Sequence, residues 1–357
     1  MDSKVITRRS TRDDVARQAG VSKTTVTYVL GDRFDVAIPE TTRERVRGVA
    51  RQLGYHPHAA AQALRSGRTN TVTVAFPIRI GAHNAHVLQA IERQTNAQGY
   101  HLMATTIGHV GMENVEPDLN ALLTSLTDGL ILVDMPAAFL PYIDRILPGD
   151  KPIVSVGVFT VPGTESVEVD LEDGIAEALA HLLAASPKRL AFFGPGLPDA
   201  EEVLETYADA AQGQLDPRLF AYCQAMSASG RPVEIIAGSP GNRTMSMTAL
   251  RGHVLEQGCP DALLCFNDEM AIGANRALRE LGYRVPEDVL LVGCDGSEEG
   301  EYMTPPLSTI AQPIDRMCEE AWSLMTERLS DPDAPRRSVR VHARFICRGS
   351  SQRGQVN

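Results

Sequence analysis

The first regular pattern of apolar and polar positions covers Thr11 to Leu30, TRDDVARQAGVSKTTVTYVL. Val15, Ala16 and Ala19 recur at three- and four-residue intervals, which places them on one face of a helix. Gly20 follows directly, and glycine readily adopts the left-handed conformation that ends a helix. The pattern therefore predicts a short helix that stops at Gly20.

A second short helix follows, and Ser22 can cap it by accepting a backbone N–H. Its positions separate onto two faces, with Val26, Val29 and Leu30 inward and Lys23, Thr24 and Tyr28 outward. This is the layout of a helix-turn-helix, whose second helix lies in the DNA major groove with its N-terminal residues at base edges. An ordinary αα-hairpin is the alternative interpretation of the same residues.

A third helix is predicted in ETTRERVRGVARQLGY, where Val46, Val49, Ala50 and Leu53 form an apolar stripe that Gly54 ends. Residues 1–56 therefore predict a small all-α head. Residues 57–69 favour a helix but are short, and isolated helices of that length are marginal in water. This segment is expected to fold only against a partner, and a plain interdomain linker is the alternative.

From Thr71 the pattern changes to short β-branched runs that alternate with helical segments, one of them near residues 87–99. The apolar runs include TVTVAFPI, YHLMATTI, LTDGLILVDMP, KPIVSVGVF and KRLAFFGPG. Such alternation predicts parallel sheets with helices on both faces. The strands are too many for one small sheet, so we expect an α/β body of two doubly wound lobes, with ligands bound in a cleft at the carboxyl ends of the strands.

The expected body covers residues 70–348. Its first lobe is predicted at about 70–168 and 299–328, and its second at about 169–298 and 329–348. Residues 349–357 are polar and are expected to form a frayed tail.

Composition restricts the class of protein. The chain has 357 residues, 43% of them hydrophobic, and it contains no apolar run long enough to cross a bilayer. The first residues, MDSKVITRRS, lack an apolar signal segment, so we expect a cytoplasmic protein without a membrane partner. All six cysteines lie in the second half without a CxxC pair, which favours reduced, mostly buried thiols over disulfides or zinc.

The net charge of −11 conceals an asymmetry. Residues 1–70 hold 13 Lys and Arg against 7 Asp and Glu, whereas the remainder holds 21 against 38. A basic head on an acidic body fits a head that meets phosphate and a body that does not.

The sequence contains no complete match to the enzyme motifs considered below. GPGLPD lacks the pattern of a phosphate loop or of a complete dinucleotide fingerprint, and no GxSxG elbow occurs. His83 and His86 are read as two loop histidines without a neighbouring carboxylate or Cys, which argues against a metal site. We therefore expect neither catalysis nor a cofactor, and a nicotinamide-dependent enzyme is a remote alternative.

The chain resembles the lactose/galactose repressor (LacI/GalR) family of bacterial transcription regulators along essentially its whole length. The matching segments stand in the family's order: DVARQAGVSKTTVTYVL, TRERVRGVARQLGYHP, AAAQALRSGRT, PDALLCFNDEMAIGANRALRELGYRVPEDVLLVGCDGSE and PPLSTIAQP. The resemblance implies a helix-turn-helix head, a hinge helix and a two-lobed body of the periplasmic-binding-protein-like type. It further implies a homodimer that binds double-stranded, palindromic operator DNA. A small-molecule effector, a sugar or another metabolite, is then expected to weaken or strengthen this binding.

The resemblance also assigns roles in the head. Lys23, Thr24 and Tyr28 hold the base-reading positions, and Tyr28 replaces an arginine that is frequent there, which implies a changed operator. Phosphate contacts fall to Ser22, Thr25 and Thr27. In the hinge, Leu64 corresponds to a leucine wedged into the minor groove, with Ala60 and Ala61 allowing close approach.

In the body, Asn267 and Asp295 match the residues that hydrogen-bond effector hydroxyls, and Asp268 is expected to cap a helix from Glu269. Relatives carry an Arg four residues before an aromatic that Gly precedes, and the segment EEVLETYADAA places Val203 and Tyr207 there. Val203 supplies no donor. Three alternatives follow: the effector is not an ordinary sugar, its polar anchor lies elsewhere (Arg79, His83, Asn84 or His86), or effector response is lost. A small-molecule binding protein with a vestigial head is the rival class.

Overall fold

The structure is a computed structural model that describes residues 10–31, 33, 36–55, 67–77, 81–107, 122, 126–135, 142, 151–195 and 216–353. The chain divides into two compact units, Met1–Thr69 and Asn70–Asn357. Each unit is described by itself.

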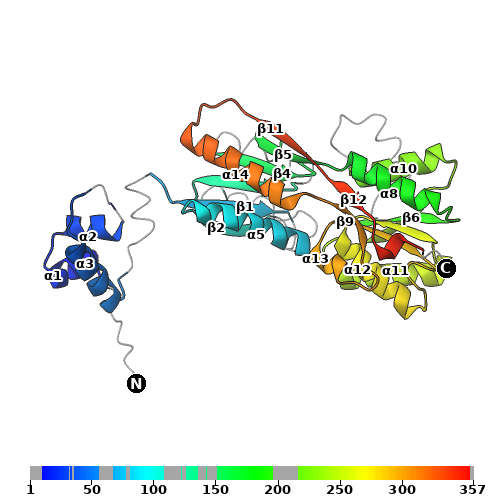
Figure 1. The fold of residues 1–357 in the computed structure, drawn as a ribbon, viewed down its shortest axis with the longest axis horizontal. Helices are drawn as coiled ribbons and strands as arrows, with labels where there is room; N and C mark the ends of the chain where they lie inside the picture. Colours follow the sequence, from blue (N-terminus) through cyan, green and yellow to red (C-terminus); the bar gives the residue numbers. More distant parts are fainter. Residues whose placement is uncertain are drawn as a thin grey trace, which may run out of the picture. The chain divides into compact units, whose positions relative to one another are not determined.

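The described part of the first unit contains the helices α1 (Arg12–Ala19), α2 (Lys23–Leu30) and α3 (Glu40–Gln52) (Figure 1). Thr11 and Asp14 form a capping box at the start of α1, and Gly20 ends the helix with φ 65°. The helices enclose one apolar core: Val15, Ala16, Ala19, Val26, Val29, Val46 and Ala50. The helix-turn-helix and the third helix that the apolar pattern predicted are therefore present.

Arg43 of α3 is buried in this unit although it is charged. Its Nη2 donates to the carbonyls of Arg33, at 2.7 Å, and Val36, at 3.0 Å, and its Nε donates to that of Ile38 at 3.3 Å. All three carbonyls belong to the connection between α2 and α3. One guanidinium therefore stabilises the connection that follows α2.

In the second unit, a first sheet has the order β11-β5-β4-β3-β1-β2, with every pair parallel. Its strands are β1 (Thr71–Phe76), β2 (His101–Thr106), β3 (Gly129–Val133), β4 (Ile153–Gly157), β5 (Glu165–Asp170) and β11 (Ser338–His342). Helices α5 (Ala82–Ala97) and α14 (Ile314–Ser330) pack together against this sheet. We call this assembly the first lobe.

The second lobe is built on a sheet of order β12-β10-β9-β8-β6-β7. Its neighbouring strands are parallel except for β12 and β10, which are antiparallel. Its strands are β6 (Leu190–Pro195), β7 (Ile235–Gly238), β8 (Ala262–Cys265), β9 (Leu290–Asp295), β10 (Ser308–Ala311) and β12 (Arg344–Ile346). Helices α8 (Glu172–Ala184) and α10 (Pro217–Ala228) share one buried cluster with this sheet, and α11 (Arg243–Gln257) and α12 (Asp268–Glu280) share another. The predicted pair of doubly wound lobes is confirmed.

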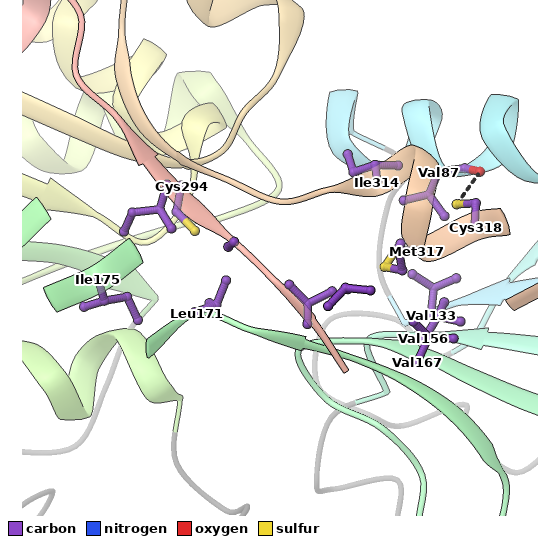
Figure 2. Close-up of a cluster of buried hydrophobic side chains, with 14 of the residues drawn as sticks. Val87, Val133, Val156, Val167, Leu171, Ile175, Cys294, Ile314, Met317 and Cys318 are labelled. Carbon is purple, nitrogen blue, oxygen red and sulfur yellow. Dashed lines mark hydrogen bonds between the residues drawn. The ribbon is translucent and has the colours of Figure 1, made fainter. Parts of the chain in front are cut away.

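The chain passes between the two sheets three times: after β5, between β10 and α14, and at Ala343 between β11 and β12. A single buried cluster extends through these crossings (Figure 2). It joins Val133 and Val156 of the first sheet, packed near Met317, to Leu171, Ile175 and Cys294 on the second-lobe side. Because this core is continuous, the lobes are connected by packed side chains as well as by chain.

Three sequence expectations need correction. Strand β10 pairs with β9 and strand β11 pairs with β5, so residues 299–311 belong to the second lobe and 338–342 to the first, the reverse of the expected assignment. Helix α5 begins at Ala82, earlier than residue 87. Residues 349–351 form a short 3-10 helix whose Ser350 is buried and donates to the carbonyl of Leu291, so the tail is ordered there. Apolar periodicity marks elements but does not show which strands pair.

Among the described residues, none of the helices combines the length and apolar composition that crossing a membrane requires. All six cysteines are free thiols, and Cys347 alone among them is exposed. The expected reduced and mostly buried thiols are therefore present.

Candidate functional site

The outward face of α2 carries the three positions expected to read bases. Lys23 and Thr24 are exposed, and Tyr28 is half-buried with the Arg33 guanidinium 5.9 Å from its ring centroid. The Lys23 ammonium lies 2.5 Å from a carboxylate oxygen of Asp13 on α1. Both groups of this ion pair are more than half exposed, so water screens it and it contributes little to stability. Lys23 can therefore exchange Asp13 for another acceptor at small cost.

The three hydroxyls expected at phosphates are engaged within the head. Ser22 caps α2 by accepting from the Thr25 amide at 3.0 Å, and the two side-chain oxygens lie 2.9 Å apart. Thr27 donates to the Lys23 carbonyl and accepts from Arg12. These bonds begin and stabilise α2, and phosphate contact by Ser22, Thr25 and Thr27 stays a prediction. Leu64, Ala60 and Ala61 of the expected hinge lie outside the described residues.

In the second unit, polar side chains from both lobes converge at the carboxyl ends of the strands. Asp134 directly follows β3 of the first lobe, and Asp295 ends β9 of the second. His83, in the first turn of α5, lies between them: Nε2 is 3.9 Å from Asp134 Oδ2, and Nδ1 is 3.7 Å from Asp295 Oδ1. With their neighbours, these residues make up what we call the interlobe cluster: His83, Asp134, Asp216, Arg218, Asp295 and Gln312.

Arg218, at the start of α10, is the cation of the interlobe cluster. Its Nε and Nη2 donate to the two carboxylate oxygens of Asp216, at 2.9 and 2.7 Å, and its Nη1 donates to the Phe266 carbonyl at 3.1 Å. The guanidinium also stacks on the Phe266 ring, 3.8 Å from its centroid. The side chain is 7% exposed, so the pair with Asp216 is largely removed from water.

This arginine stands at the spacing that was expected at Val203 and Tyr207. The expected motif, an Arg four residues before an aromatic, occurs at Arg218 and Tyr222, with Ala221 in the place of Gly. Val203 and Tyr207, where the motif was placed, lie outside the described residues, as does Arg79. The spacing was available in the sequence, but the change of Gly to Ala hid it.

Burial shifts the ionisation of the interlobe cluster. It raises the pKa of Asp134, and it raises the pKa of Asp295 well above the usual range, with the neighbouring Asp268 carboxylate adding to the shift. Burial, with a smaller contribution from the nearby Arg218, lowers the pKa of His83 to about 4. His83 is therefore neutral at neutral pH. Gln312 donates its amide to Asp295 Oδ1 at 3.1 Å.

The cap of helix α12 (Asp268–Glu280) is Asn267 and not Asp268, which was expected to cap it. Asn267 caps α12 by accepting from the Met270 amide, and its own amide donates to the Pro240 carbonyl, both at 2.9 Å. Asp268 is the first residue of α12, and its carboxylate accepts from Ser297 and Thr309. Asn267 thus uses both ends of its side chain within the protein, and its contact with an effector stays a prediction.

The two histidines are not loop residues remote from acids, as the sequence suggested. Both lie in the first turns of α5, and His86 Nε2 is 3.7 Å from Asp315 of α14. Even so, within the described part of the chain no three His, Cys, Asp or Glu side chains are grouped so that they could hold a metal ion.

A three-helix head with an exposed recognition helix, followed by two α/β lobes with a polar cluster between them, defines a DNA-binding regulator with a ligand-binding body. Residues 11–58 match the family described as "Bacterial regulatory proteins, lacI family", and residues 179–351 match the "Periplasmic binding protein-like domain". The head of this chain is therefore similar to lacI-family regulatory proteins, and much of its body is similar to periplasmic-binding-protein-like domains.

Curated relatives extend over nearly the full length. The chain is 28% identical to the HTH-type transcriptional repressor PurR of Vibrio atlanticus over 346 residues, 96% of this chain and 98% of that protein. It is 29% identical to the PurR repressor of Aliivibrio fischeri over 345 residues, with the same shares covered.

Solved structures share the fold. The lac repressor dimer bound to operator and the anti-inducer ONPF superposes with a TM-score of 0.74 at 23% identity, covering 96% of this chain and 99% of that one. The transcriptional regulator CelR in complex with cellobiose gives 0.62 at 24% identity, covering 96% and 100%.

Proposed function

We propose that the protein is a sequence-specific transcriptional repressor that binds a palindromic operator as a homodimer and responds to a small molecule bound between the lobes of its body. The observation that carries the proposal is the helix-turn-helix, whose α2 presents Lys23 and Thr24 to solvent at its N-terminal end. That end of a recognition helix reaches base edges in the major groove. The PurR relatives are named as transcriptional repressors, and the lac repressor dimer, which has a similar fold, was solved bound to its operator.

Base reading by Lys23 requires it to leave Asp13. Lysine donates to guanine O6 and N7, and Thr24 offers a methyl group for thymine or a hydroxyl for a hydrogen bond. Tyr28 can do either, and its ring already packs beside Arg33. The exposed Lys23–Asp13 pair keeps the ammonium over the start of α2 until DNA replaces the carboxylate.

Effector response is proposed at the interlobe cluster. A ligand that contacts Asp134 on one lobe and Asp295 on the other binds the closed arrangement better than an open one, and it shifts the population by that difference in affinity. The three chain crossings then change the spacing of the segments that lead to the head. Contacts by Arg218 are part of this proposal, as are those expected of Asn267, Arg79 and Tyr207. The protein acts in the cytoplasm, by binding and not by catalysis.

The proposal is tested by selecting DNA from a random pool with the full-length protein, followed by footprinting at several salt concentrations. A palindromic site is expected, with binding that weakens steeply as salt rises. In Lys23→Ala, the preference at one base position should relax, at a cost of roughly 1–3 kcal/mol. Arg51→Ala, which changes an exposed residue in the last turn of α3, is the charge-matched control and should select the same sequence. Enrichment of no palindrome would identify a small-molecule binding protein with a vestigial head.

A further inference from the structure

The positive charge of Arg218 is already compensated inside the interlobe cluster. Two of its nitrogens face the two oxygens of Asp216, and a third donates to the carbonyl of Phe266. A bidentate guanidinium–carboxylate pair of this geometry is strong, and the Asp216 carboxylate compensates the charge of the guanidinium. Arg218 therefore adds no unpaired positive charge for an incoming ligand.

Asp134 and Asp295, in contrast, receive only neutral donors from the residues that the structure describes. Asp134 Oδ1 accepts from the amides of Val158, at 2.7 Å, and Phe159, at 3.3 Å, and Asp295 accepts from Gln312. His83 is too far from either carboxylate for a hydrogen bond, and burial keeps it neutral. Two carboxylates from opposite lobes thus face one another across an uncharged ring.

Two polar atoms beside Asp295 lack a hydrogen-bond partner within the described part of the chain. They are Gln312 Oε1 and His83 Nδ1. Gln312 is only 8% exposed, and its oxygen can only accept a hydrogen bond. A buried acceptor without a donor is unfavourable, so the arrangement favours a ligand that donates a hydrogen bond.

From this charge balance and these open acceptors, we propose that the effector carries a protonated amine, which lies between Asp134 and Asp295. The inference rests on the proposed effector site and names the chemistry of its ligand. An alkylammonium has three donors and one positive charge, which match two carboxylates and one amide oxygen. Burial raises the pKa of both carboxyl groups, and an ammonium between them favours their ionised form. A neutral polyol supplies donors but no compensating charge.

The same placement couples binding to closure. When both carboxylates are ionised, their repulsion opposes the approach of the lobes, because one belongs to each. An ammonium between them replaces this repulsion with two attractions, and it does so only when the lobes are together. The ligand class and the conformational response therefore follow from the same pair of side chains.

The test compares amines with neutral counterparts by calorimetry on the full-length protein at neutral pH. The probes are D-glucosamine against D-glucose, and putrescine against the diol of the same chain length. The amine of at least one pair should bind at least about tenfold more tightly than its counterpart. Asp295→Asn should abolish this preference. Asp173→Asn, an exposed acid in the first turn of α8, is the matched control and should keep it.

Equal responses within both pairs, including no response, would overturn the inference, as would an amine preference that survives in Asp295→Asn. Should Asp295→Asn fail to fold, Asp134→Asn replaces it, with the same expected loss. Operator binding distinguishes this failure from failure of the proposed function. A protein that selects a palindrome but shows no amine preference keeps its function and loses only this ligand class.

Discussion

Arg43 offers a sharp test of how the head holds its recognition helix. The side chain is 3% exposed and donates three hydrogen bonds to the connection between α2 and α3. Arg43→Ala removes all three hydrogen bonds to the carbonyls of that connection. At roughly 1–1.5 kcal/mol for each bond, the loss is about 3–5 kcal/mol.

That loss is large for a unit of this size. Domains are stable by roughly 0.05–0.15 kcal/mol per residue. The unit spans residues 1–69, so its total stability is about 3–10 kcal/mol. We therefore expect a head that is partly or wholly unfolded in Arg43→Ala, with operator affinity lowered at least about tenfold.

Two readouts separate the head from the body. The chain has a single tryptophan, Trp322, buried in α14 of the body, so its fluorescence follows unfolding of the body alone. Fluorescence anisotropy with labelled operator follows the head. In Arg43→Ala the tryptophan transition should be unchanged while operator binding is lost. Arg51→Ala removes the same charge from an exposed site on the same helix and should keep a folded head. Equal operator affinity in the two variants would refute the reasoning.

Three further predictions concern the body. Arg218→Ala leaves buried carboxylates without their cation and should destabilise the body by roughly 3–5 kcal/mol, and an unchanged denaturant midpoint would contradict this. In Gly293→Ala the new methyl group collides with the carboxylate of Asp268, so the melting temperature should fall. Gly252→Ala, in an open helical position of α11, is the control and should raise the melting temperature slightly. Equal shifts in the two variants would be inconsistent with the packing. In the folded protein the pKa of His83 is lowered to about 4, so between pH 6.5 and 4 this residue binds fewer protons than in the unfolded chain. The stability that His83 contributes therefore falls as the pH drops from 6.5 towards 4. His83→Gln should flatten this part of the pH–stability curve, and an equally steep curve would argue against a buried neutral His83.

Local patterns identified most of the elements. The Ser22 cap, the left-handed glycine and the apolar stripe of the head are short-range features, and the structure reproduces them between Thr11 and Gln52. The alternation of strands and helices also predicted two parallel-sheet lobes correctly. These features depend on residues a few positions apart, which a sequence displays directly.

Pairing between distant segments was not predictable in the same way. Strand β11 joins β5 and strand β12 joins β10, although only Ala343 separates β11 from β12. No local preference distinguishes these partners, because SVRVH of β11 and RFI of β12 contain no feature that specifies the neighbouring strand. The assignment of 299–311 and 338–342 to the wrong lobes has this cause.

By itself, the amino-acid sequence determined the class of the protein, the position of the recognition helix and the number of lobes. Only the tertiary structure placed His83 beside Asp134 and Asp295 and paired Arg218 with Asp216. These side chains lie on different elements, far apart in the chain, and their ionisation depends on burial that no linear pattern records. The chemistry of the ligand site is therefore a property of how the two lobes meet.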